Sequence, residues 1–140
     1  MPTKKANATW RGTLKEGDGT MSTESGAYEG EFSFAKRFGD EPGTNPEELI
    51  GAAHAGCFSM AFANELDEAG YPADEVSTEA SVHLADGSIT RIDLVTEATV
   101  PDIDDDQFQE IANDAKENCP VSRALTGGSI QEITLDATLQ

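Results

Sequence analysis

The longest apolar stretch of the chain runs from Leu49 to Ala63 and is interrupted only by His54 and Ser59. This stretch is long enough for about four helical turns and is apolar on every face, so it predicts a helix that is buried on all sides. Cys57 lies in the middle of this stretch. The cysteine is therefore central to the fold, whether it packs as a small hydrophobic residue or reacts as a thiol.

The residues on either side of the apolar stretch mark where the helix begins and ends. Asn45 can cap it, and Pro46 suits the first helical position. Glu47 and Glu48 complement the positive end of the helix, and the side chain of Glu48 could complete a capping box. Gly70 is the expected stop. The sequence therefore predicts a long central helix that begins after Asn45.

Polar and apolar residues alternate in most of the remaining chain, which is typical of strands with one buried face. The clearest case surrounds the dipeptide Asp86-Gly87, which favours the tight turn of a hairpin. The N-terminal third predicts a meander, and the C-terminal run predicts a last strand. The expected strands are residues 6–14, 20–24, 31–34, 75–84, 88–100 and 129–139.

A second helix is predicted after Asp104, which can cap it. Its apolar residues follow helical spacing along one stripe, which Cys119 continues: Phe108, Ile111, Ala112 and Ala115. Pro120 then ends this helix and can open another, so that Cys119 lies near a helix start. Backbone amides at a helix start stabilise a thiolate.

The order of strands, helix, hairpin, helix and strand predicts the α+β class, with residues 1–140 forming a single domain. A small sheet and one amphipathic helix cannot cover a central helix that is apolar all round. We therefore predict a homodimer in which the partner subunit covers the rest of the central helix.

Acidic residues outnumber basic ones 27 to 9, which gives a formal net charge of −18. This charge repels the phosphates of nucleic acids and anionic membrane surfaces, so neither is expected as a partner. The N-terminus has no apolar run that would indicate a signal peptide or a membrane span. A cytoplasmic location is the expectation.

The two cysteines, Cys57 and Cys119, match neither the clustered spacing of a zinc site nor a CxxC redox pair. Most free cysteines pack as small hydrophobic residues, so a structural role for Cys57 is the first alternative. A pair that meets in the folded chain is the second.

Four stretches of the sequence resemble the OsmC/Ohr family of thiol peroxidases, and specifically its OsmC branch. They are GTMSTESG at residues 19–26, the pair Arg37-Phe38, GTNPEELIGAAHAGCFSMA at residues 43–61, and CPVS at residues 119–122. The resemblance implies an OsmC-like fold with antiparallel sheets, a long buried central helix, a second amphipathic helix and an intertwined homodimer.

The resemblance also implies a reaction and a set of site residues. It implies reduction of organic hydroperoxides to alcohols in stress defence, through a sulfenic acid and then an intramolecular disulfide. Cys57 is then the peroxidatic cysteine and Cys119 the resolving one, while Arg37 stabilises the thiolate and Glu47 orients Arg37. No metal or cofactor is implied, and the resemblance suggests an external dithiol of the dihydrolipoamide type as the reductant.

Glu47 and Cys57 lie far apart on the predicted central helix. Glu47 precedes Cys57 by 10 positions, which is about 15 Å along a straight helix, so their side chains cannot meet within it. Arg37 could span part of this distance within its own chain, or the partner subunit could supply Arg37 and Glu47. We predict an active site at the dimer interface.

The surroundings of Cys57 leave alternatives open. Apolar neighbours favour bulky organic peroxides over hydrogen peroxide, or are simply core: Ile50, Phe58, Met60, Ala61 and Phe62. His54, one turn before Cys57, could serve a Cys-His hydrolase, although a structural or supporting role is expected because arginine serves the chemistry of the family. A non-catalytic protein that binds a lipid-like ligand is the main alternative function.

The charge excess leads to a first prediction. If the acidic surface is an adaptation to a salt-rich cytoplasm, the melting temperature will fall on dialysis into low salt, where the charges repel one another without screening. Thermal melts at low and high salt test this. Equal melting temperatures would remove the hypothesis.

Overall fold

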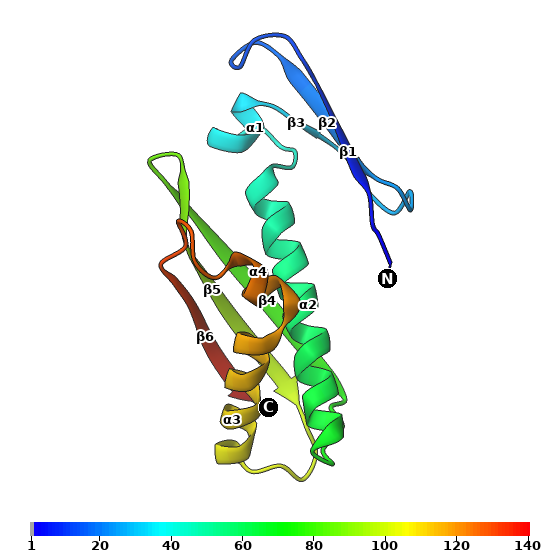
Figure 1. Cartoon of the computed structure of the whole chain (residues 1–140), viewed down its shortest axis with the longest axis vertical. Coiled ribbons are helices and arrows are strands. Elements are labelled where there is room, and N and C mark those ends of the chain that lie inside the picture. Colours follow the sequence, from blue (N-terminus) through cyan, green and yellow to red (C-terminus); the bar gives the residue numbers. More distant parts are fainter. Residues whose placement is uncertain (1) are drawn as a thin grey trace. The chain divides into compact units, whose positions relative to one another are not determined.

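The computed structural model describes residues 2–140, and the chain forms two compact units, one ending at Leu49 and the other comprising Ile50–Gln140. The first unit contains a three-stranded sheet, and the second contains another sheet with helices packed against it (Figure 1). Strands and helices do not alternate regularly along the chain, and the predicted α+β class is confirmed.

The sheet of the first unit is an antiparallel meander in the order β1-β2-β3, as predicted. Its strands are β1 (Ala6–Arg11), β2 (Asp18–Thr23) and β3 (Glu29–Phe32). A short helix, α1 (Phe34–Phe38), follows β3, and the hydroxyl of Ser33 caps it by accepting the Lys36 N–H. The sequence pattern does not predict α1, because five residues are too few to show helical periodicity.

The predicted central helix is confirmed as α2 (Pro46–Glu68). Asn45 caps it as expected, since its side-chain oxygen accepts the Glu48 N–H at 2.7 Å. The side chain of Glu48 does not complete a capping box but instead accepts the hydroxyl of Thr44 at 3.1 Å. The helix stops before Gly70, whose φ of +94° is a left-handed conformation that favours glycine.

Within the single chain α2 is buried on one face only, as the shortage of covering elements predicts. One face is buried and consists of Gly51, His54, Phe58, Phe62 and Leu66. The opposite face is exposed and carries small residues around a Met side chain that is 78% exposed: Ala52, Ala53, Gly56 and Met60. Within the second unit, other elements pack on only one side of this helix. Among residues 2–140, no helix is both long and apolar enough to span a membrane.

The sheet of the second unit contains the predicted hairpin, formed by β4 (Glu75–Ala85) and β5 (Ser88–Thr99). Both turn residues, Asp86 (φ 52°) and Gly87 (φ 78°), have the positive φ angles of a type I′ turn. This turn matches the right-handed twist of the two strands, which explains why the Asp-Gly signal is reliable here.

The last strand, β6 (Glu132–Leu139), pairs with β5 in parallel, so the sheet of the second unit is mixed and the expectation of antiparallel pairing holds for β4 and β5 but is wrong for β6. The reason is the connection, which passes through α3 (Asp105–Asn118) and α4 (Pro120–Leu125) before it returns to the sheet. A crossover of this length allows two strands to run in the same direction.

The core of the second unit lies between the helices and the sheet. α2 and α3 meet at Phe62 and Phe108, whose ring centroids are 5.3 Å apart. The apolar stripe predicted on α3 is confirmed, because Phe108, Ala112 and Ala115 are buried. Asp104 caps α3 as predicted, since its carboxylate accepts the Gln107 N–H at 2.8 Å.

Candidate functional site

The two cysteines lie on different helical elements of the second unit. Cys57 is half-buried on α2, and Cys119 is buried at the junction of α3 and α4. Pro120 creates this junction, because proline lacks an N–H and disfavours the helical conformation of the residue before it. Cys119 is accordingly extended (φ −63°, ψ 140°) and caps α4, with its sulfur accepting the Ser122 N–H at 3.4 Å.

The structure places the two thiols near each other, and the pKa of Cys57 reflects this environment. Burial is the largest effect and raises the pKa of the Cys57 thiol. A hydrogen bond from the Val121 backbone opposes this rise, and the neighbouring Cys119 adds to it. The balance favours the protonated thiol, so ionisation of Cys57 requires a positive charge nearby.

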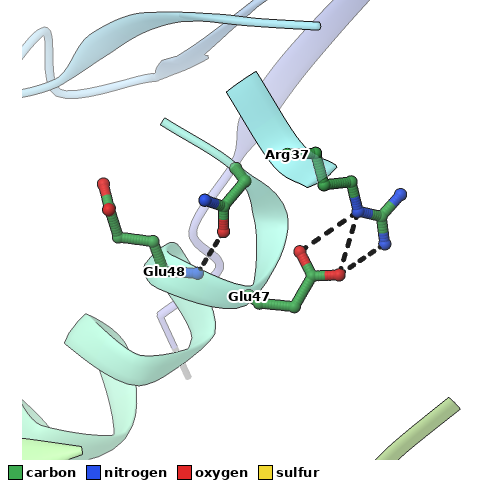
Figure 2. Close-up of polar contacts among 4 residues, drawn as sticks. Arg37, Glu47 and Glu48 are labelled. Atoms are coloured by element: carbon green, nitrogen blue, oxygen red, sulfur yellow. Dashed lines mark hydrogen bonds and ion pairs between the residues drawn. The ribbon is translucent and has the colours of Figure 1, made fainter. Parts of the chain in front are cut away.

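Arg37 and Glu47 form the second predicted pair, within the first unit. The guanidinium of Arg37 donates from Nε to Oε1 of Glu47 at 2.9 Å and to Oε2 at 3.2 Å, and from one terminal nitrogen to Oε1 at 2.6 Å. Figure 2 shows this pair beside Glu48, at the start of α2. Such two-pronged contact fixes the plane of the guanidinium as well as its position.

The rest of the Arg37 side chain is also supported. Its guanidinium lies 5.1 Å from the ring centroid of Phe38, a distance typical of a cation–π contact. Phe38 packs in turn on Phe34, with the ring centroids 5.0 Å apart. α1 therefore presents Arg37 on an aromatic support, while Glu47 sets its orientation.

Arg37 also lines an apolar pocket of about 270 Å³ in the first unit. Its other walls are mostly aromatic: Trp10, Leu14, Phe32, Ser33, Phe34 and Phe38. The rings of Trp10 and Phe32, on the outer strands, approach to 5.3 Å because Gly19 lies between them on β2 and has no side chain. Sequence reasoning gave Trp10 only a structural role, since the pairing of strands is needed to bring it to Arg37.

A buried polar chain around Cys119 is the feature that the sequence analysis missed. The Cys119 thiol donates to the Ser122 hydroxyl at 3.1 Å, and that hydroxyl lies 2.7 Å from Nε2 of His54. His54 is fully buried, and burial lowers its pKa below the ordinary value, which favours neutral imidazole. The CPVS motif contains Ser122, but nothing in the sequence links it to a histidine on another helix.

The described part of the chain contains no cluster of side chains suited to binding a metal ion. Across residues 2–140, no group of three or more His, Cys, Asp or Glu side chains could hold a metal ion. The predicted site residues instead form two pairs, Arg37 with Glu47 and Cys57 with Cys119.

The chain is similar to a known protein family and to several of its members. The model of the family described as OsmC-like protein matches residues 39–134. Peroxiredoxin OsmC of Escherichia coli K12 is 49% identical over 98% of this chain and 96% of its own length. Organic hydroperoxide resistance protein OhrB of Bacillus subtilis 168 is 34% identical over 66% of this chain and 69% of its own length. The crystal structure of OhrB matches with a TM-score of 0.64 and 26% identity, covering 97% of this chain and 98% of that one.

The buried imidazole of His54 predicts a pH dependence of stability. Because the pKa of His54 is lower in the folded chain, the unfolded chain binds a proton here first as the pH falls below about 6.5. The free energy of unfolding therefore decreases with falling pH, by at most about 1.4 kcal/mol per pH unit from this group. The variant His54→Gln lacks this contribution.

Urea unfolding of wild type and His54→Gln, from about pH 7.5 to about pH 5, measures the effect as a difference between two proteins. Contributions from the other titrating groups are common to both proteins and cancel. We expect the wild type to lose more stability than the variant as the pH falls. A constant difference across this range would contradict a neutral, buried His54.

Proposed function

This chain belongs to the OsmC-like protein family, and from that premise we propose that it is a cysteine-based peroxidase that reduces organic hydroperoxides to alcohols. The higher identity to peroxiredoxin OsmC than to OhrB agrees with the OsmC branch that the sequence motifs indicate. The observation that carries the proposal is the proximity of the thiols of Cys57 and Cys119, two residues far apart in the sequence.

In the first step, the Cys57 thiolate attacks a peroxide oxygen, the O–O bond breaks, and the alcohol leaves. Cys57 is left as a sulfenate, which takes up a proton to become the sulfenic acid. Burial favours the thiol form of Cys57, so the step needs a cation that stabilises the thiolate. We assign this role to Arg37, whose orientation by Glu47 leaves it ready to bind an anion or a peroxide oxygen.

In the second step, Cys119 attacks the sulfenic acid of Cys57 and closes a disulfide, which protects Cys57 from further oxidation. An external dithiol, for which dihydrolipoamide is the candidate, then reduces the disulfide and returns both thiols. The cycle needs no metal and no bound cofactor, since each electron passes through sulfur.

We infer that the active protein is a homodimer. The exposed face of α2 supports this, because it presents Met60 among small residues that permit close approach of another chain. The dimer would place Arg37 and Glu47, from the same or the partner subunit, over Cys57. Because Glu47 and Cys57 are 10 positions apart on α2, about 15 Å along a straight helix, the partner subunit is an economical source.

The expected substrate is a peroxide with an apolar organic group. The aromatic pocket beside Arg37, about 270 Å³ in volume, supports this preference, because hydrogen peroxide would gain nothing from an apolar wall. The same pocket also suits the alternative function, a protein that holds a lipid-like ligand without turnover. The raised pKa of Cys57 favours that alternative if no cation reaches the thiol.

Turnover separates the two functions. With dihydrolipoamide as reductant, we expect the protein to consume cumene hydroperoxide quickly and hydrogen peroxide more slowly, and mass spectrometry to detect a Cys57–Cys119 disulfide. Cys57→Ser abolishes turnover because it removes the nucleophile, and Cys119→Ser leaves Cys57 to over-oxidise. Absence of turnover, with both thiols free and slow to alkylate, would favour ligand binding instead.

Subunit mixing tests whether the site is shared. Cys57→Ser and Arg37→Ala are each expected to be inactive as homodimers. If the partner subunit supplies Arg37, their heterodimers contain one intact site, and activity returns after mixing. Tagged chains and mass spectrometry of the assembled dimers verify exchange. Heterodimers that form but remain inactive would place Arg37 and Cys57 of one active site in the same chain.

A further inference from the structure

The polar chain of Cys119, Ser122 and His54 is buried throughout. Cys119 and Ser122 are each 1% exposed, and His54 is 0% exposed. Three different elements contribute to it, namely the α3–α4 junction, α4 and α2. It ends at one of the two cysteines of the proposed reaction.

The hydrogen bonds of this chain can all point in one direction, from Cys119 through Ser122 to His54. The thiol of Cys119 donates to Oγ of Ser122 at 3.1 Å, so the hydroxyl hydrogen of Ser122 is free to donate to Nε2 of His54 at 2.7 Å. Nε2 can accept only if the imidazole is neutral and carries its hydrogen on Nδ1. Neutral imidazole is the form that burial of His54 favours.

The same atoms can also form the hydrogen bonds that are needed after a proton has moved from Cys119 to His54. Protonated His54 would donate from Nε2 to Ser122, and the Ser122 hydroxyl would donate to a Cys119 thiolate. The backbone N–H of Ser122, 3.4 Å from the Cys119 sulfur, donates to that sulfur already and stabilises a thiolate better than a thiol. Proton transfer thus reverses two hydrogen bonds without moving a heavy atom.

We propose that Ser122 and His54 form a proton relay that takes the thiol proton of Cys119 while this cysteine attacks the sulfenic acid of Cys57. The inference rests on the proposed peroxidase function and concerns only its second step. Ser122 touches the reacting sulfur and is a catalytic residue. His54 acts through Ser122 and is a positioning residue that also receives the displaced proton.

The step balances within the protein. The S–H bond of Cys119 and the S–O bond of the Cys57 sulfenic acid break, and the disulfide bond forms. The Cys119 proton passes to Ser122 as the Ser122 proton passes to His54, and the relay then returns a proton to the departing hydroxide, which leaves as water. The Cys119 sulfur is oxidised as the Cys57 sulfur is reduced, so no further oxidant is required.

The environment of His54 suits transient rather than permanent protonation. A lowered pKa keeps the imidazole neutral between turnovers and therefore ready to accept. Within residues 2–140, Nδ1 of His54 has no hydrogen-bond partner, so no carboxylate holds the imidazole in its charged form. A relay of this kind accelerates attack by Cys119 without storing a thiolate that would react with other oxidants.

A single-turnover experiment tests the relay. Reduced protein is mixed with one equivalent of cumene hydroperoxide, and samples are quenched with dimedone, which traps sulfenic acid, and N-ethylmaleimide, which traps thiols. We compare wild type with Ser122→Ala, which breaks the relay, and His54→Gln, whose amide can still hydrogen-bond to Ser122 but cannot take a proton. Ser59→Ala is the control, because Ser59 on α2 bonds Thr78, outside the relay.

In all four proteins we expect Cys57 to be oxidised at the same rate. In Ser122→Ala and His54→Gln, the sulfenic acid should then persist about 100-fold longer before the disulfide forms, the lower range of general acid–base effects. Ser59→Ala should match the wild type. Disulfide formation at the wild-type rate in both relay variants would overturn the relay alone. Failure of wild-type Cys57 to oxidise would overturn the peroxidase function and, with it, the step that the relay serves.

Nitrogen NMR of isotope-labelled histidine tests the relay in the unaltered protein. The chain has two histidines, and His54→Gln assigns their signals, with exposed His83 as the comparison. The relay requires the reduced protein to show His54 neutral, with hydrogen on Nδ1 and Nε2 bare. Hydrogen on Nε2 of neutral His54 would overturn the proposal even if a substituted protein failed to fold.

Discussion

The packing of α2 against α3 is the interaction on which the second unit depends. Phe62 and Phe108 make the contact in the core. From there the buried positions on α2 continue back to His54, and those on α3 continue forward to Cys119 and, beyond the proline, to Ser122. Because the two helices run in opposite directions along this seam, residues 54 and 122 meet at its far end. The proximity of the two thiols and the polar chain therefore follow from aromatic packing.

Much of this arrangement could be predicted from local sequence. The Asp86-Gly87 turn, the cap at Asp104 and the break at Pro120 each depend on the conformational preference of one or two residues, and the structure confirms all three. The parallel pairing of β6 could not be predicted in this way, because its residues alternate as they would in either kind of sheet. Pairing direction depends on the route of the intervening chain.

The candidate site likewise contains residues that the sequence could identify and residues that it could not. Family motifs identified Cys57, Cys119, Arg37 and Glu47, and the structure pairs them two by two. The motifs gave no reason to join His54 to Ser122, because that hydrogen bond depends on how two helices pack. The sequence analysis expected that a single chain cannot cover α2 on every face, and in the structure one face of this helix is exposed around Met60.

The contact between Trp10 and Phe32 in the aromatic pocket depends on Gly19, a residue with no side chain. A methyl group added to Gly19 would lie 2.6 Å from Cε1 of Phe32 and 2.7 Å from the carbonyl oxygen of Thr9, so even alanine would displace the ring or spread the strands. Glycine weakens a strand on its own, yet here it creates the space across which two rings from the outer strands meet. In a survey of natural or engineered variants, this position would therefore vary less than the large side chains around it.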